Sequence, residues 1–219
     1  RVASEAHVAG LMSDKAGVLH LHLGDGVRGL ELVRRALDET ELPARVFHPT
    51  HVNRRKALFE EALALATRGC TVDVTAFPVD GGADAWSAVE AWERYQASGA
   101  PPERLTISSD AGGCLPTFDH DGRLCKMEVG SAHALLDTVR ALLARGHALE
   151  RVLPAFTRNI GRHLRLAGKC EISVGADADL VALDAAGNVA DVMAQGVWHL
   201  RDGEVLRAGL FENAQADRA

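Results

Sequence analysis

Along the first two thirds of the chain, short apolar runs alternate with longer segments whose apolar residues recur at helical spacing. The apolar runs predict β-strands, and they span residues 17–23, 45–51, 70–76 and 104–109. The segments with helical spacing predict helices over residues 27–39, 55–68, 83–98, 132–145 and 149–163. This alternation predicts an α/β fold with a parallel sheet, which is either doubly wound or part of a (β/α)₈ barrel.

The pattern changes at about Lys169, where helical spacing disappears. Short strands separated by Gly and Asp turns are predicted over residues 171–175, 179–183, 189–199 and 204–206. We therefore expect two domains, a βα-rich domain over 1–165 and a β-rich segment over 166–219. Its last residues, 211–219, are polar and predict a frayed tail.

Composition narrows the class of protein. The chain has 219 residues, of which 47% are hydrophobic and 25% charged, as in ordinary globular proteins. Its net charge of −6 argues against non-specific binding to nucleic acid or to anionic membranes. No apolar run approaches the ~20 residues that span a bilayer. The four cysteines are scattered without a Cys-x-x-Cys pair, so we expect reduced thiols in a soluble, cytoplasmic protein.

Three residues with ligand chemistry lie near the carboxyl ends of predicted strands: His22, His51 and Asp110. Because the carboxyl ends of parallel strands open onto one face, we expect these side chains to converge. Two imidazoles and a carboxylate suit Zn²⁺ or a related divalent metal. A structural interpretation is also open for each, since a strand histidine can be a satisfied core residue and an Asp before glycines can cap or turn the chain.

Arg54 follows His51 by three residues, in a loop expected on the same face. A guanidinium there suits a substrate carboxylate through bidentate pairing. Alternatively, Arg54 belongs to a solvated basic run over residues 54–56. Other catalytic patterns are missing: the sequence has no Gly-x-Ser-x-Gly elbow, no phosphate-binding loop and no dinucleotide fingerprint after its first predicted strand.

Three strings carry a family resemblance: His22-Leu23-Gly24-Asp25, Pro49-Thr50-His51-Val52-Asn53-Arg54 and Ser108-Ser109-Asp110. They closely resemble the amidohydrolase superfamily and, more narrowly, the isoaspartyl (β-aspartyl) dipeptidases. Residues 168–172 and 175–181 are similar to the superfamily's C-terminal β-sandwich segment. The resemblance runs nearly from end to end of the chain.

The resemblance implies the second half of a (β/α)₈ metallohydrolase barrel, with strands five to eight in residues 1–165 and part of a β-sandwich in 166–219. It implies two zinc ions, one bound by His22 and His51 and the other by Asp110. Asp110 would also act as general acid/base toward a zinc-activated water, and Arg54 would bind a substrate carboxylate. The implied activity is hydrolysis of β-aspartyl dipeptides by a homo-oligomeric enzyme.

The chain departs from the family pattern at two places. Cys114 stands where the family has a serine that contacts substrate. The superfamily's first-strand His-x-His pair and bridging carboxylated lysine lie far upstream of the position of His22, which only 21 residues precede here. We therefore expect this chain to be inactive by itself. One alternative is a cyclic amidohydrolase of the dihydroorotase or hydantoinase kind; Arg54 in the string Pro49–Arg54 favours the dipeptidases over it. The other alternative is a non-catalytic fragment. Tight binding of two metal ions per chain would count against the fragment.

Overall fold

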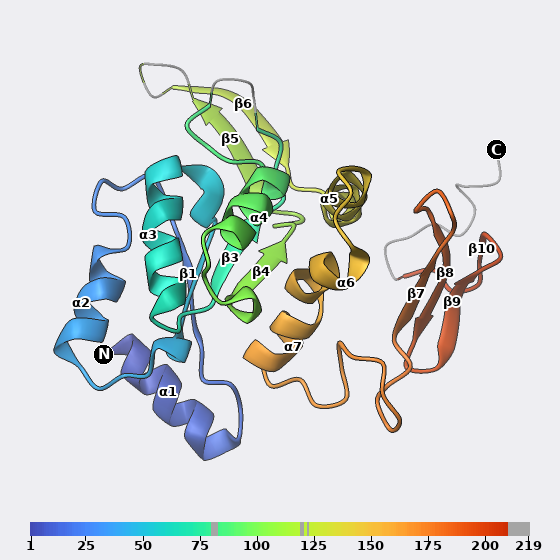
Figure 1. Cartoon of the computed structure of the whole chain (residues 1–219), viewed down its shortest axis with the longest axis horizontal. Helices are drawn as coiled ribbons and strands as arrows, with labels where there is room; N and C mark the ends of the chain where they lie inside the picture. The colour runs from blue at the N-terminus through green and yellow to red at the C-terminus, as the bar shows by residue number, and fades with distance from the viewer. Residues whose placement is uncertain (80–82, 119–120, 122, 210–219) are drawn as a thin grey trace. The chain divides into compact units, whose positions relative to one another are not determined.

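A computed structural model describes residues 1–79, 83–118, 121 and 123–209. His120, the end of the Gly- and Pro-rich loop over 77–82 and the predicted tail over 211–219 lie outside the described residues. The chain divides into two compact units, residues 1–165 and 166–219 (Figure 1), and each is treated by itself below.

The first unit is built on two parallel strand pairs. Strand β1 (Leu19–His22) pairs with β2 (Phe47–Thr50), and β3 (Val72–Thr75) pairs with β4 (Leu105–Ser108). Strands β2 and β3 also lie against each other. Each strand lies within one of the apolar runs predicted from the sequence, and the predicted α/β class is confirmed.

Seven α-helices accompany these strands in the described part of the first unit: α1 (Val2–Ser13), α2 (Glu31–Glu39), α3 (Lys56–Thr67), α4 (Ala88–Ala97), α5 (His133–Ala144), α6 (Leu149–Val152) and α7 (Arg158–His163). Helices α3 and α4 pack against β3. Every residue of β2 and β3 is buried, as expected for parallel strands covered on both faces. Phe59 of α3 and Trp92 of α4 are among the largest fully buried side chains.

Two helical segments differ from the sequence prediction. The helix predicted over 149–163 is divided into α6, a 3-10 turn η4 (Leu153–Phe156) and α7. Pro154 in the first turn of η4 has no amide hydrogen to continue the preceding helix. Helix α1 lacks an apolar stripe and was not predicted. Its backbone packs closely against the segment before β1, since a Cβ on Gly10 would lie 2.4 Å from the Gly17 Cα.

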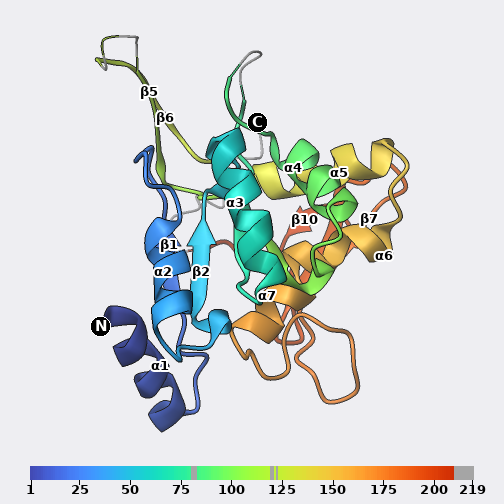
Figure 2. The same ribbon diagram turned by 60° about the vertical axis from the view of Figure 1, so that its left-hand side comes forward.

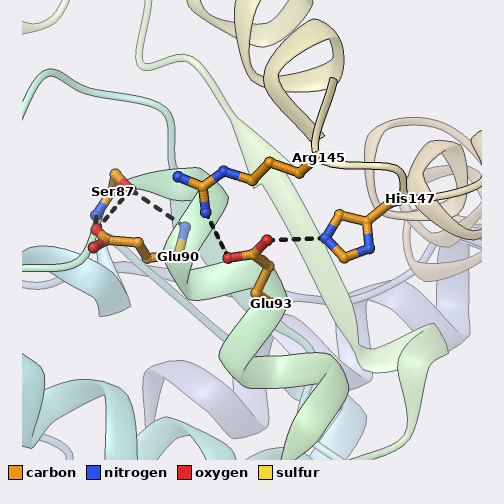
Figure 3. A network of polar contacts seen from close by, with 5 residues as sticks. All are labelled: Ser87, Glu90, Glu93, Arg145 and His147. Atoms are coloured by element: carbon orange, nitrogen blue, oxygen red, sulfur yellow. Dashed lines mark hydrogen bonds and ion pairs between the residues drawn. The ribbon is translucent and has the colours of Figure 1, made fainter. Parts of the chain in front are cut away.

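A polar network fastens α4 to the segment that follows α5 (Figure 3). Ser87 and Glu90 form a capping box at the start of α4. One turn further along α4, Glu93 accepts hydrogen bonds from Arg145, at 2.7 Å, and from the His147 ring, at 2.9 Å. The contact with Glu93 gives His147 a structural role.

An antiparallel hairpin, β5 (Cys114–Phe118) and β6 (Leu124–Val129), projects from the first unit (Figure 2). All six residues of β6 are exposed. The hairpin was not predicted, because an exposed strand lacks the buried apolar pattern that marks a strand in a sequence. It begins directly after the Asp110 turn.

The second unit carries a four-stranded antiparallel sheet in the order β10 (Glu204–Val205), β9 (Val197–Arg201), β8 (Val189–Ala194), β7 (Leu180–Leu183). The strand predicted over 189–199 is two strands, because Gln195 and Gly196 adopt positive φ angles of 49° and 76° and turn the chain. The strand predicted over 171–175 is wrong: this segment forms turns, with the Ala176 amide bonded to the Ser173 carbonyl at 3.1 Å.

No helix in the described part of the chain is both long and apolar enough to cross a bilayer.

Candidate active site

The structure brings His22 and His51 together at the carboxyl ends of β1 and β2. Their rings meet at an angle of 61°, with His22 Nδ1 2.9 Å from His51 Nε2. The other ring nitrogen of His51, Nδ1, lies 2.8 Å from the Thr75 hydroxyl oxygen at the end of β3. His51 is thus oriented from both sides, by β1 and by β3.

Local backbone geometry explains why His51 points this way. The residue follows β2 directly and has a left-handed φ of 64°, which turns the chain into the 3-10 helix η2 (Val52–Arg54). Asn53 fixes this helix to β3: its Oδ1 accepts from the Thr75 amide at 2.9 Å, and its Nδ2 donates to the Thr75 carbonyl at 3.0 Å. Asn53 is fully buried.

Asn53 and Thr75 are positioning residues that the sequence analysis did not single out. Asn53 lies inside the string Pro49–Arg54 that carries the family resemblance. Its place between His51 and Arg54 was the sequence signal that could have identified it. Thr75 had no local signal beyond its place at the end of a predicted strand.

Arg54 is held at the end of η2 by the turn that follows β1. Its Nη1 donates to the Leu23 carbonyl at 2.7 Å, and its Nε lies 3.1 Å from a carboxylate oxygen of Asp25. Its side chain is 34% exposed, against 66% for Asp25. Arg54 is therefore an oriented guanidinium rather than part of a solvated basic run.

Asp110 follows β4 in a tight turn, with a left-handed φ of 48° and its carbonyl accepting from the Gly113 amide at 2.9 Å. Two glycines make room for it. A Cβ on Gly113 would lie 2.6 Å from the Asp110 carboxylate, and one on Gly130 would lie 2.3 Å from the Asp110 carbonyl oxygen. The chain continues into a strand, so Asp110 does not cap a helix.

A cavity of about 420 Å³ joins these candidates, and His51, Arg54 and Asp110 all line it. His22 reaches it through its contact with His51. Further lining residues come from the first turn, from β3 and the loop after it, and from the hairpin: Asp25, Thr75, Phe77, Pro78, Cys114, Leu115, Pro116 and Glu128. Cys114, which stands where the family has a serine, thus lies at the cavity.

The donor chemistry of this site fits a divalent cation in part. Burial is the main cause that lowers the pKa of His51, which favours the neutral imidazole that binds metals. The nearby Asp110 carboxylate opposes this shift. Within the described ranges, no group of three or more His, Cys, Asp or Glu side chains is arranged to hold a metal ion. Of the three residues expected to bind metal, His22 and His51 are in direct contact, with ring nitrogens 2.9 Å apart.

Behind the site lies a buried polar layer. The Asp73 carboxylate on β3 accepts hydroxyl hydrogen bonds from Thr50, Thr106 and Ser108, at 2.6, 2.7 and 2.6 Å. Burial raises the pKa of Asp73, against the effect of these hydroxyls. The residue was not singled out, although an Asp within a β-branched strand was a signal.

Three further histidines, His20, His48 and His163, form a cluster beside this polar layer. His48 Nδ1 lies 3.0 Å from His20 Nδ1, and its other nitrogen lies 3.1 Å from the Thr106 hydroxyl. The His163 ring packs against His48 with a centroid distance of 4.4 Å and an angle of 59° between the ring planes. Burial lowers the pKa of His48 to about 3 and that of His163 to about 4.

No protein-family model matches the chain. Among solved structures, a β-aspartyl dipeptidase from the thermophilic, keratin-degrading Fervidobacterium islandicum AW-1, in complex with β-Asp-Leu dipeptide, matches with a TM-score of 0.88 and 33% identity. The match covers 96% of this chain and 55% of that one. A second structure of a β-aspartyl dipeptidase from the same organism matches with a TM-score of 0.82 and 32% identity, over 96% and 53% of the two chains.

An adenosine deaminase from Xanthomonas campestris with bound Zn is similar in fold, with a TM-score of 0.51 at 17% identity over 94% of this chain and 51% of that one. The two dipeptidase structures place the chain in the amidohydrolase superfamily, and the deaminase shares the fold. Within it, the resemblance read from the motifs is confirmed, and the chain belongs with the β-aspartyl dipeptidases. It spans about half the length of the dipeptidases that it matches.

Proposed function

We propose that this chain is the C-terminal half of a metal-dependent hydrolase that cleaves β-aspartyl dipeptides. The observation that carries this proposal is the shared cavity in which His51, Arg54 and Asp110 meet. The likeness to β-aspartyl dipeptidases over 96% of the chain supports it. In this proposal the parallel strands belong to the second half of a (β/α)₈ barrel, and the second unit contributes to a C-terminal β-sandwich.

His22, His51 and Asp110 would hold divalent metal, with two zinc ions in the complete site. When bound, such ions supply Lewis-acid activation of a water molecule and of the scissile carbonyl. His22 and His51 already face each other across 2.9 Å. The Thr75 hydroxyl, at 2.8 Å from His51 Nδ1, keeps the ring in place.

Asp110 would act as the general acid/base. Its carboxylate would take the proton from the attacking water and then pass it to the amine that leaves when the amide bond breaks. The tight turn fixes Asp110 at the cavity wall, and Gly113 and Gly130 leave the space that the residue needs. A fixed carboxylate makes proton transfer depend little on chain motion.

Arg54 would pair with a carboxylate of the dipeptide. Its contacts with the Leu23 carbonyl and with Asp25 orient the guanidinium at the cavity while leaving the cation 34% exposed. An oriented fork favours a planar carboxylate over a neutral carbonyl. This supports a substrate with a free carboxylate, such as a dipeptide.

The decisive experiment compares substrates on the full natural protein supplied with Zn²⁺. We expect hydrolysis of β-Asp-Leu, with much slower cleavage of α-Asp-Leu and of cyclic amides such as dihydroorotate or hydantoin. Cleavage of a cyclic amide without cleavage of β-Asp-Leu would replace the proposal by a cyclic amidohydrolase. Metal analysis adds a second arm, because a protein that binds no metal and cleaves none of these substrates is a non-catalytic scaffold.

A matched pair of variants tests the role of Arg54. Arg54→Gln should raise KM for β-Asp-Leu at least tenfold, since a charge-assisted bidentate pair is lost. Arg55→Gln, at the next residue, is the control and should keep KM, because Arg55 donates to the Asp25 carbonyl and does not line the cavity. Equal KM values in the two variants would remove Arg54 from substrate binding.

The proposal also includes a homo-oligomeric protein in the cytoplasm. Cys70, Cys114, Cys125 and Cys170 are all free thiols, which agrees with a reducing compartment. Light scattering on the purified protein tests the oligomer, and a monomer at micromolar concentration would exclude it.

A further inference from the structure

A second cavity of the first unit lies at the opposite ends of the strands from the candidate active site. It measures about 250 Å³ and is lined by Arg45, Thr71, Glu103, Arg104, Asn159, Arg162, His163 and Arg165. Arg45 lies in η1 (Ala44–Val46), directly before β2, and Arg104 lies in η3 (Pro102–Arg104), directly before β4. Thr71 immediately precedes β3. The cavity is therefore at the amino ends of β2, β3 and β4.

The charged side chains that line this cavity are mostly positive, whereas the whole chain is negative. Four arginines line it against one glutamate, whereas the whole chain has a net charge of −6. This excess of guanidinium groups over carboxylates gives the cavity a positive potential, which favours the binding of an anion.

The printed contacts of Arg45 and Arg165 leave much of the hydrogen-bonding capacity of these two arginines for a ligand. Arg45 donates one bond, from Nη1 to the Ala16 carbonyl at 3.2 Å. Arg165 lies 4.0 Å from Asp14, a carboxylate that is fully exposed. A guanidinium has five donor hydrogens, so neither contact saturates its arginine.

One of the lining residues, His163, also carries a buried polar atom without a partner. His163 Nε2 is buried without a hydrogen-bond partner, although His163 lines the cavity. Buried unpaired polar atoms are rare in native proteins and commonly mark an ion or a water that completes them. Arg104 and Arg45 add to burial in lowering the pKa of His163 to about 4, so the ring is neutral at pH 7 and offers an N–H donor or a lone pair.

We propose that this cavity binds a small tetrahedral oxyanion of the phosphate class, either inorganic phosphate or the phosphate group of a small monoester. Guanidinium groups from three separate segments surround the space. This arrangement suits the several oxygens of a phosphate better than the two coplanar oxygens of a carboxylate. The volume of 250 Å³ lies below the ~300 Å³ typical of sites for drug-sized ligands, which limits the ligand to a small one.

The site is separate from the candidate active site. The two cavities have no lining residue in common, and the length of the parallel strands separates them. The oxyanion is accordingly a structural or regulatory ligand of the amino end and takes no part in the proposed hydrolysis.

The test titrates inorganic phosphate into the full natural protein, followed by calorimetry and by the melting temperature. Sodium chloride and sodium acetate at matched ionic strength are the reference titrations. We expect saturable binding of phosphate and a rise in melting temperature that neither chloride nor acetate produces. Equal effects of the three salts would overturn the proposal, and stronger binding of acetate would assign the cavity to a carboxylate.

Variants locate the bound phosphate. Arg104→Gln should weaken phosphate binding at least tenfold, and Arg162→Gln, which changes an exposed residue of α7, should weaken it severalfold. Arg158→Gln is the matched control, since Arg158 is exposed on the same helix and does not line the cavity. Arg54→Gln tests the other cavity. Loss of phosphate binding in Arg54→Gln with retention in Arg104→Gln and Arg162→Gln would overturn the proposal.

Discussion

The two ends of the parallel strands differ in how their polar side chains are satisfied. At the carboxyl ends, site residues contact one another: His22 faces His51, and Arg54 pairs with Asp25. At the amino ends, arginines share a cavity, and the buried Nε2 of His163 has no partner. Chemistry on a substrate requires side chains that are held in place before it binds. A site that only holds an anion can leave its charges to be satisfied by that anion.

A buried polar layer around Asp73 lies between the two ends of the strands. Asp73 binds hydroxyls on β2 and β4 at once, through Thr50, Thr106 and Ser108. Two of these donors lie within two residues of His51 and Asp110. The rigidity of the carboxyl-end site therefore depends on a buried carboxylate that touches neither cavity.

The largest contrast between the ends should appear in catalysis. Asp110→Asn should lower kcat for β-Asp-Leu by about 10²–10⁴-fold, because an amide cannot accept the proton from water. The fold should persist, since Asn tolerates the left-handed φ of 48° at this position. Steady-state kinetics with a thermal melt measures both. Arg104→Gln at the amino end is the control and should keep kcat; a similar loss in both variants would remove the distinction between the ends.

The second largest effect concerns the layer between the ends. Asp73→Ala should lower the free energy of unfolding by about 3 kcal/mol, because the buried Thr50 hydroxyl loses its acceptor and Thr106 keeps only the longer bond to the Val72 carbonyl and its contact with His48. Urea denaturation measures the change. Glu60→Ala, at an exposed position of α3, is the control and should change stability by less than about 0.5 kcal/mol. A loss below 1 kcal/mol in Asp73→Ala would show that the hydroxyls find other partners.

Acid should destabilise the protein through the buried histidines. His48 and His163 have folded pKa values of about 3 and about 4, below the 6.5 of an exposed histidine. Between these values the unfolded chain binds more protons, so stability is full above pH 6.5 and falls as the pH is lowered toward 4. At pH 5 the loss is roughly 2 kcal/mol per histidine.

A variant separates this effect from general acid denaturation. His163→Phe keeps a ring against His48 but cannot bind a proton, so it should remove about 2 kcal/mol of the loss between pH 7 and pH 5. Urea melts at the two pH values provide the comparison. His199→Phe, in the second unit, is the control. If His163→Phe loses as much stability as the parent protein, the depressed pKa of His163 is wrong.

The last prediction concerns the reactivity of two cysteine thiols, one at each end of the strands, and has no expected effect on catalysis or stability. Cys70, just before β3 at the amino ends, is buried, and burial raises its pKa to about 11. Cys114 is exposed at the wall of the carboxyl-end cavity. At pH 8 a thiol reagent should label Cys114 within minutes and Cys70 only in urea, because the thiolate is the reactive form. Peptide mass spectrometry with Cys125 as the exposed reference checks this; early labelling of Cys70 would show that the amino end opens.

Local pattern was sufficient where burial follows sequence periodicity. The buried runs around β2 and β3 and the apolar face of α3 were readable, because each residue's burial is set by its own position along a strand or helix. The same logic failed for the exposed hairpin β5–β6 and for segment 171–175. Exposed segments carry no burial pattern, so their conformation is decided by turns and neighbours.

By itself, the sequence determined the α/β class, the strand ends that carry His22, His51 and Asp110, and the family resemblance. Only the tertiary structure decided that Asn53 bonds to Thr75, that Asp73 links β2 to β4, and that four arginines from distant segments share one cavity. The physical reason is the range of the interactions. Periodicity reports which face of an element is buried, whereas contacts between side chains far apart in the chain exist only once the strands have packed side by side.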